Sequence, residues 1–209
     1  GRGGITAVFL NLLLFSFWAV IHSLMARNGF KNLVARSIGP DFYKLVYVSL
    51  AGITQCLLLY FWRPLRGDIW HLEGIWYWLL TLAFLGAMAF GFYACLVLDY
   101  FEVLGLQVFL RRMRNQPDPE PRLSLRGPYA YCRHPVYLAS ILFFWVGPVM
   151  TVNRLVFAIL GTVYILIGTR LEERDSVREL GEAYMRYQEN VPMILPRLTP
   201  WHPDNVREN

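Results

Sequence analysis

The chain has 209 residues, of which 56% are apolar and only 17% are charged, and its net charge is +5. A soluble globular chain carries about 25% charged residues, so the composition excludes an ordinary soluble domain. The spacing of the three cysteines fits neither a disulfide framework nor a zinc centre, and we expect no metal site. We interpret residues 1–209 as a single membrane domain.

Five apolar segments predict an all-α integral membrane protein with five transmembrane helices. The segments are 5–25, 42–61, 76–98, 137–150 and 155–169. The first three have about the 20 residues that a helix needs to cross a bilayer. The last two are shorter and only TVNR separates them, so they predict a short helical hairpin. The residues after the hairpin predict a cytosolic amphipathic helix.

The basic residues predict the orientation in the membrane. With five spans, 16 of the 20 Lys and Arg residues fall on one side, and the side richer in Lys and Arg is cytoplasmic as a rule. We therefore expect the N-terminus outside and the C-terminus inside. The basic residues are dispersed along membrane boundaries, a pattern that favours contact with membrane lipids and no nucleic-acid partner. Nothing in the sequence indicates an obligate protein partner.

Two polar clusters border the predicted hairpin, YAYCRHP before it and TRLEERD after it. In the second cluster, Val177 begins an apolar stripe at alternating spacings of three and four residues, the spacing of one helical face. Glu173 and Arg170 precede Val177 by four and seven residues, so we expect both on this buried face. Glu172 lies about 100° round the helix.

A carboxylate at this depth is costly without a partner. Arg133, Arg170 or a bound cation could supply one, and a structural ion pair such as Arg133 with Glu173 accounts equally well for either residue alone. Ionisable groups at a membrane edge nevertheless favour a functional site. Paired carboxylates with aromatic rings suit an ammonium or sulfonium, while arginine and histidine suit a carboxylate. The cluster therefore predicts a site for a zwitterionic or cationic ligand.

The two clusters also carry a family resemblance. GPYAYCRHPVYLAS, residues 127–140, resembles the G-P-Y-x-Y-x-R-H-P-x-Y-x-G/A motif of isoprenylcysteine carboxyl methyltransferases and their bacterial relatives. RLEERDSVRELGEAYMRYQENVP, residues 170–192, resembles the tail of that family. The match covers roughly residues 126–197 and implies a membrane enzyme that binds S-adenosyl-L-methionine as methyl donor at its cytosolic face. The resemblance implies that the donor is held by Tyr129, Arg133, His134, Pro135, Tyr137, Leu138, Glu172 and Glu173.

Three further stretches are similar to bacterial membrane-bound methanethiol S-methyltransferases: HSLMARNGFK, LDYFEVLGLQVF and FFWVGPVMTVNRLVFA. The chain departs from the expected pattern at Tyr100, where we expect His, and at Ala139, where the broader family often has Gly. The similarity implies a bacterial inner-membrane enzyme that methylates the sulfur of methanethiol, giving dimethyl sulfide and S-adenosylhomocysteine. Other small thiols, a prenylcysteine carboxylate or a lipid amine are alternative acceptors. A nicotinamide-dependent membrane reductase and a non-catalytic membrane protein are the alternatives outside this class.

A thiol has a pKa of about 8.5, so a base or a nearby cation would assist its attack. The candidates are His22, Glu102 and Arg170. His22 could equally be an interfacial histidine bonded to a backbone carbonyl, and Glu102 could pair with Arg111 or Arg112. We expect Cys132 to be a small packing residue and not a nucleophile.

Overall fold

The computed structural model describes residues 2–98, 106–114, 116 and 123–202, which are mostly helical. It divides into two compact units. The first unit comprises residues 1–71, 99–119 and 149–160, and the second comprises residues 72–98, 120–148 and 161–209.

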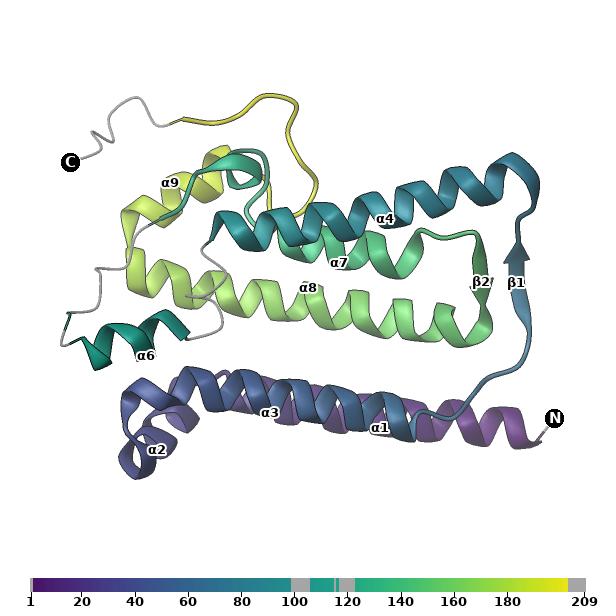
Figure 1. Cartoon of the computed structure of the whole chain (residues 1–209), viewed down its shortest axis with the longest axis horizontal. Coiled ribbons are helices and arrows are strands. Elements are labelled where there is room, and N and C mark those ends of the chain that lie inside the picture. Colours follow the sequence, from purple (N-terminus) through teal and green to yellow (C-terminus); the bar gives the residue numbers. More distant parts are fainter. Residues whose placement is uncertain (1, 99–105, 115, 117–122, 203–209) are drawn as a thin grey trace. The chain divides into compact units, whose positions relative to one another are not determined.

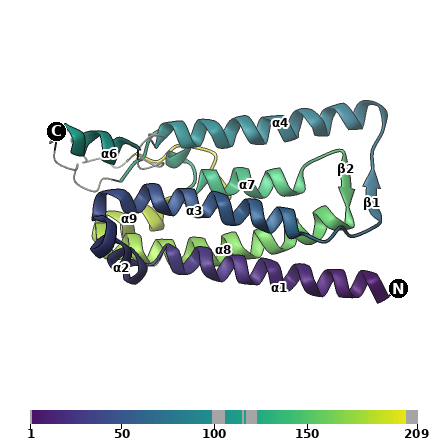
Figure 2. The ribbon, with the colours of Figure 1, turned by 60° about the horizontal axis from the view of Figure 1, so that its bottom comes forward.

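The first unit is built on three helices that follow one another in the sequence: α1 (Arg2–Met25), α2 (Asn28–Ile38) and α3 (Pro40–Phe61). Gly39, with φ of +87°, separates α2 from α3, and the proline after it occupies the first position of α3, where no backbone N–H is needed. Helices α1 and α3 lie side by side, α2 packs against both, and α6 (Leu106–Met113) packs against α3 (Figures 1 and 2).

A buried asparagine ties α1 to the segment that follows α3. The Asn11 side chain is fully buried in an otherwise apolar helix. Its Nδ2 donates to the Arg63 carbonyl and its Oδ1 accepts from the Arg63 N–H, both at 2.8 Å. Both polar atoms of the amide are therefore satisfied, which removes the cost of burying them.

The first unit also holds a two-stranded antiparallel sheet, formed by β1 (Asp68–His71) and β2 (Val149–Thr151). Trp70 pairs with Met150 and His71 with Val149, and the register shifts between Asp68 and Trp70. Just after β2, the chain enters α8 (Val152–Leu180), whose first residues, 152–160, belong to this unit. Asn153 Oδ1 accepts from Trp62 Nε1 at 2.7 Å, which joins the start of α8 to the end of α3.

The second unit contains α4 (Gly74–Val97), the 3-10 helix η1 (Gly127–Ala130), α7 (Pro135–Trp145), α8 from residue 161 onward and α9 (Glu182–Asn190). Helices α4 and α7 lie side by side (Figures 1 and 2). A Cβ placed on Gly91 would lie 3.0 Å from the Cβ of Ala139. The helices therefore approach closely only because small residues face each other there, and alanine serves where the broader family often has glycine.

The predicted fifth apolar segment ends at residue 169, but the helix that contains it, α8, does not end there. It continues without a break to Leu180, because the residues after 169 are good helix formers such as Leu, Glu and Arg. The break comes instead at Gly181, whose φ of +57° an L side chain would rarely adopt. The predicted fifth segment and the start of the predicted amphipathic helix are therefore one helix, and α9 is a separate short helix.

Among the described residues, three helices are long and apolar enough to cross a membrane, judged by length and composition: Gly4–Met25, Gly74–Val97 and Val152–Leu180. Two apolar helices are shorter, Leu45–Phe61 and Pro135–Trp145. The chain therefore has the helices of a membrane protein, while the count of five spans and the hairpin stay predictions.

Candidate functional site

The polar residues predicted to form a site meet in the second unit around the turn between η1 and α7. We call Arg133 and His134 the corner. Both residues donate their backbone N–H groups to the segment after α9, Arg133 to the Pro192 carbonyl at 3.0 Å and His134 to the Met193 carbonyl at 3.1 Å. The corner is thus fixed by main-chain bonds to a segment about 60 residues later in the chain, as backbone groups without a helical partner require.

The Glu173 carboxylate lies at the centre of the site. Its residue is only 8% exposed. Oε1 accepts from Arg133 Nε at 2.6 Å and lies 3.1 Å from His134 Nε2. An ionised carboxylate can only accept, so the proton of the second contact lies on Nε2 of the histidine. Oε2 accepts from Gln188 Nε2 at 3.0 Å. Both carboxylate oxygens are therefore occupied by protein donors.

The Arg133 guanidinium also closes the end of α9. Its NH1 group donates to the carbonyl of Gln188 at 3.0 Å and to that of Val191 by a short contact. Carbonyls at a helix C-terminus lack helical partners and attract a cation. Arg133 thus links α9 to Glu173 of α8, with 9% of its side chain exposed.

A second carboxylate stands beside the first on α8. The Tyr137 hydroxyl donates to Glu172 Oε2 at 2.6 Å. The Tyr137 ring stacks on the His134 ring, with 5.4 Å between ring centroids and 9° between planes. Glu172 is exposed, whereas Glu173 is buried. Of the two, Glu172 is therefore the more exposed carboxylate.

A hollow of about 460 Å³ opens next to Glu173, lined by Arg170, Glu173, Arg174, Val177, Arg178 and Gln188. Arg170 is exposed there, so the expectation that it shares the buried face of Glu173 is wrong. The buried side of α8 is set by Thr169 and Glu173, four residues apart, and Arg170 lies about 100° round from Thr169. Extrapolating the apolar stripe back from Val177, which is itself half-buried, placed Glu173 correctly but failed at Arg170, three residues further back.

The family resemblance also implies Tyr129, Pro135 and Leu138 for donor binding. The contacts of these three residues lie within the protein. Tyr129 is buried; its hydroxyl donates to the Ala94 carbonyl at 3.3 Å and its own carbonyl accepts from Tyr187. Pro135 is buried at the first position of α7. The Leu138 N–H donates to the His134 carbonyl in the first turn of α7. These three shape the backbone around the corner.

Burial also decides the ionisation of two groups near the corner. It raises the pKa of the Cys132 thiol to about 11, so this cysteine is a neutral packing group at physiological pH. Burial, together with the neighbouring Glu173 charge, raises the pKa of Tyr184 to about 12. The described part of the chain holds no group of three His, Cys, Asp or Glu side chains that could bind a metal ion.

Of the three candidates for assisting the thiol, Arg170 lies in the second unit, whereas His22 does not. Glu102 and Tyr100 lie outside the described residues. His22 belongs to the first unit, where its Nε2 lies 3.2 Å from the Tyr47 hydroxyl. The His22 ring stacks on Trp18, at 5.2 Å and 21°. His22 therefore lies in an aromatic setting with a hydroxyl partner on the neighbouring helix α3.

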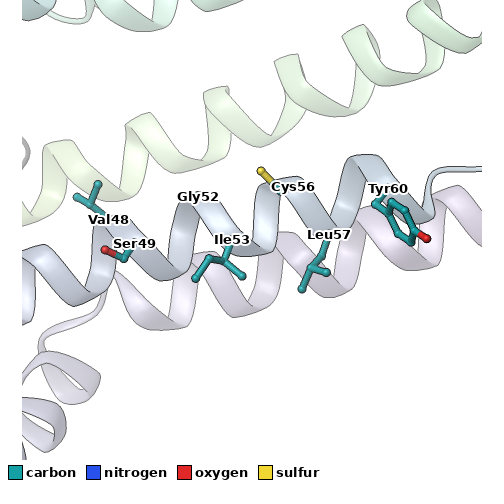
Figure 3. A pocket seen from close by; sticks show the side chains of 7 residues that line it. All are labelled: Val48, Ser49, Gly52, Ile53, Cys56, Leu57 and Tyr60. Atoms are coloured by element: carbon teal, nitrogen blue, oxygen red, sulfur yellow. The ribbon is translucent and has the colours of Figure 1, made fainter.

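A second hollow, of about 620 Å³, lies on one face of α3 in the first unit (Figure 3). Its lining residues are Val48, Ser49, Gly52, Ile53, Cys56, Leu57 and Tyr60. None of these side chains is charged at neutral pH, so the hollow has no group that could hold a zwitterion.

Sequence reasoning missed Gln188 and the segment from Val191 to Trp201 that covers the corner. Besides the bonds to Pro192 and Met193, the N–H of Trp201 donates to the Ala130 carbonyl. A polar residue at a turn of a short helix carries no periodic signal of its own. The Val-Pro pair at the end of the tail motif was the available hint, because the residue before a proline is held extended.

Comparison with known proteins identifies the family of the chain. Residues 65–191 match the family described as "Protein of unknown function (DUF1295)". Methanethiol S-methyltransferase 1 of Bradyrhizobium diazoefficiens is 36% identical, over 91% of this chain and 67% of its own. The methanethiol S-methyltransferases of Pseudomonas deceptionensis and Mycobacterium tuberculosis are each 35% identical, over 92% and 91% of this chain and 74% and 78% of theirs. No solved structure matches. The chain therefore belongs to the DUF1295 family and to the family of the methanethiol S-methyltransferases, and it is a methyltransferase.

Proposed function

We propose that this enzyme transfers the methyl group of S-adenosylmethionine to the sulfur of methanethiol. The relatives carry this acceptor in their names. The observation that carries the proposal is the meeting of two motifs at Glu173, which Arg133 and His134 reach across 40 and 39 residues of sequence. Both motifs lie within the stretch that matches the family, except for Pro192 at the end of the second.

The residues around the corner fit the polar groups of S-adenosylmethionine. Glu172 offers an exposed carboxylate for the ammonium. The stacked rings of His134 and Tyr137 offer aromatic faces, which attract a sulfonium. Arg170 lines the adjoining hollow and can pair with a carboxylate. Glu173 is satisfied by the protein and is proposed to hold the corner rather than the ligand.

The reaction is a direct displacement. The bond between the methyl carbon and the sulfonium sulfur breaks, its electron pair stays on the leaving thioether, and a bond forms between that carbon and the acceptor sulfur. The products are dimethyl sulfide, S-adenosylhomocysteine and the proton of the thiol. No covalent enzyme intermediate is needed. The task of the protein is to align the reacting atoms, where orientation can contribute several kcal/mol, on the order of 7 in favourable cases.

The thiol proton must leave before or during attack, since the thiolate is the better nucleophile. We propose that His22 accepts it, with the Tyr47 hydroxyl orienting the imidazole ring. Glu102 remains the alternative base. We further propose that the corner faces the cytosol, because Arg170, Arg174 and Arg178 extend from the end of the apolar part of α8, and the basic side of a membrane protein is cytoplasmic.

An acceptor assay tests the function. Purified protein in lipid nanodiscs is given S-adenosylmethionine with a labelled methyl group and, separately, methanethiol, a prenylcysteine or phosphatidylethanolamine. We expect label in dimethyl sulfide alone. Label only in the prenylcysteine or the lipid would replace the acceptor and keep the class of enzyme. A titration with NADPH and with S-adenosylhomocysteine, in which only NADPH binds, would instead support the reductase alternative.

A further inference from the structure

We propose that Gln188 is a positioning residue of the donor site, acting through Glu173. The inference rests on the proposed function, because it concerns how the site binds S-adenosylmethionine and its product. Gln188 lies on α9, apart from the turn that forms the corner and from α8, which carries the two glutamates. It contacts the site through its side-chain amide and its backbone carbonyl.

Gln188 contacts both members of the central ion pair. Its side-chain amide Nε2 donates to Glu173 Oε2 at 3.0 Å. Its backbone carbonyl accepts from Arg133 at 3.0 Å. The side-chain bond is independent of the helix backbone, so it can be removed by substitution while the bond to Arg133 stays.

The side-chain bond decides how the Glu173 carboxylate is turned. A carboxylate whose second oxygen has no fixed donor can rotate about its last side-chain torsion, which is broad. With Oε2 held by Gln188, Oε1 is presented to Arg133 and His134 together. The orientation of the His134 ring, and of the Tyr137 ring stacked on it, then depends on this amide.

Docking of α9 does not depend on the same amide. The helix is anchored by a buried cluster of Tyr184, Tyr187 and Val191. Tyr187 also donates to the Tyr129 carbonyl at 2.6 Å. Loss of the Gln188 side-chain bond should therefore leave α9 in place and disturb only Glu173, which separates a positioning role from a merely structural one.

The first test is Gln188→Leu, with Glu189→Leu as the matched control. Glu189 is the next residue of α9 and is exposed. We expect Gln188→Leu to weaken S-adenosylhomocysteine binding about tenfold, the effect of one hydrogen bond to a charged group. The apparent KM for methanethiol should stay near the wild-type value, while the thermal midpoint should fall modestly because a buried carboxylate oxygen loses its donor. Glu189→Leu should match wild type throughout.

The second test is Gln188→Glu, read across pH. At pH 8.5 the new carboxylate would face Glu173 and repel it. At pH 6 a pair of carboxylates that close can share a proton, because each raises the pKa of the other. The shared proton restores a donor to Oε2. Binding of S-adenosylhomocysteine relative to wild type should therefore recover as the pH falls.

The other ionisable groups near Glu173 do not change the interpretation of this pH dependence. Arg133, Arg170 and Arg174 stay charged over this range, and Tyr184 stays neutral because its pKa is raised to about 12. His134 contacts Glu173 Oε1, so each variant is compared with the wild type at the same pH.

The outcomes are distinct. Weaker binding of S-adenosylhomocysteine by Gln188→Leu at an unchanged KM for methanethiol, together with a pH-dependent ratio for Gln188→Glu, supports the positioning role. Wild-type binding by Gln188→Leu, or an equal loss by Gln188→Glu at every pH, overturns it and leaves the proposed function intact. Failure of the wild-type protein itself to bind S-adenosylhomocysteine would overturn the proposed function and this inference together.

Discussion

The imidazole ring of His134 and the phenol ring of Tyr137 lie nearly parallel, with 9° between their planes. Each ring also makes a polar contact to a different one of two adjacent glutamates, His134 to Glu173 and Tyr137 to Glu172. One glutamate is buried and the other is exposed. The pair of rings therefore connects the buried carboxylate of Glu173 with the exposed carboxylate of Glu172.

Tyr137→Phe should weaken donor binding without disturbing the fold. The substitution keeps the ring stacked on His134 and removes the hydroxyl that donates to Glu172. Loss of a hydrogen bond to a charged group should lower the affinity for S-adenosylhomocysteine by roughly tenfold, measured by calorimetry. Tyr131→Phe is the control, because that side chain is exposed; an equal loss in the control would contradict the role of the hydroxyl.

Glu173→Gln should lower both stability and donor affinity. The substitution leaves Arg133 with an uncompensated buried charge and turns the new amide group toward a donor, either His134, Arg133 or Gln188. Breaking a buried ion pair costs about 3 kcal/mol. Thermal unfolding followed by tryptophan fluorescence measures the loss. Glu179→Gln, the same change at an exposed position of α8, should leave the unfolding midpoint unchanged.

Cys132→Ala should keep turnover close to the wild-type rate. The thiol is buried, and burial raises its pKa to about 11, so the reactive thiolate forms only in strongly alkaline solution. Iodoacetamide at pH 8 should therefore leave Cys132 unmodified in the folded protein, and should modify it after denaturation. Mass spectrometry of the peptide checks both. Inactivation by Cys132→Ala would restore a chemical role for the thiol.

Gly161→Ala should destabilise the contact between α7 and α8. A Cβ at position 161 would lie 2.6 Å from a ring atom of Phe144, so the ring must move. Overpacking of this kind costs roughly 1–3 kcal/mol. Gly168→Ala, on the same helix with open space around it, should be neutral or stabilising by up to about 1 kcal/mol. The changes in unfolding midpoint relative to wild type should therefore differ in sign or size between the two variants.

His22→Gln should reduce turnover with methanethiol by about 10²- to 10⁴-fold, the range for loss of a general base. Affinity for S-adenosylhomocysteine should change little, because the residues proposed to bind the donor belong to the second unit. Tyr47→Phe, which removes the hydroxyl 3.2 Å from His22 Nε2, should give a smaller loss of turnover. Unchanged turnover in His22→Gln would return this histidine to the alternative of an interfacial, purely structural group.

The apolar segments and the two motifs were predictable from the sequence. Long apolar runs can only be buried or placed in lipid, which is why the helices of residues 5–25 and 76–98 match α1 and α4 within a few residues. The burial of Glu173 also followed from its position one turn before Val177. The spacing of hydrophobic residues predicts the buried face of a helix well where that face is apolar.

The exposure of Arg170 and the continuity of α8 were not predictable in the same way. Charged residues ended the apolar pattern at 169, but a helix ends where its backbone geometry changes, here at Gly181. The contribution of Gln188 depends on where α9 lies in three dimensions. Side chains that act from a separate short helix leave no periodic trace in the sequence.

The segment after α9 sets an order of events in biosynthesis. Translation proceeds from the N-terminus, so the carbonyls of Pro192 and Met193, which receive the N–H groups of Arg133 and His134, are made after every apolar helix of the described chain. The turn before α7 therefore lacks these main-chain partners while the helices are still being inserted. A nascent chain arrested before residue 191 would carry every apolar helix of the described residues and still lack these two bonds, so the proposed donor site would close only after those helices have been made.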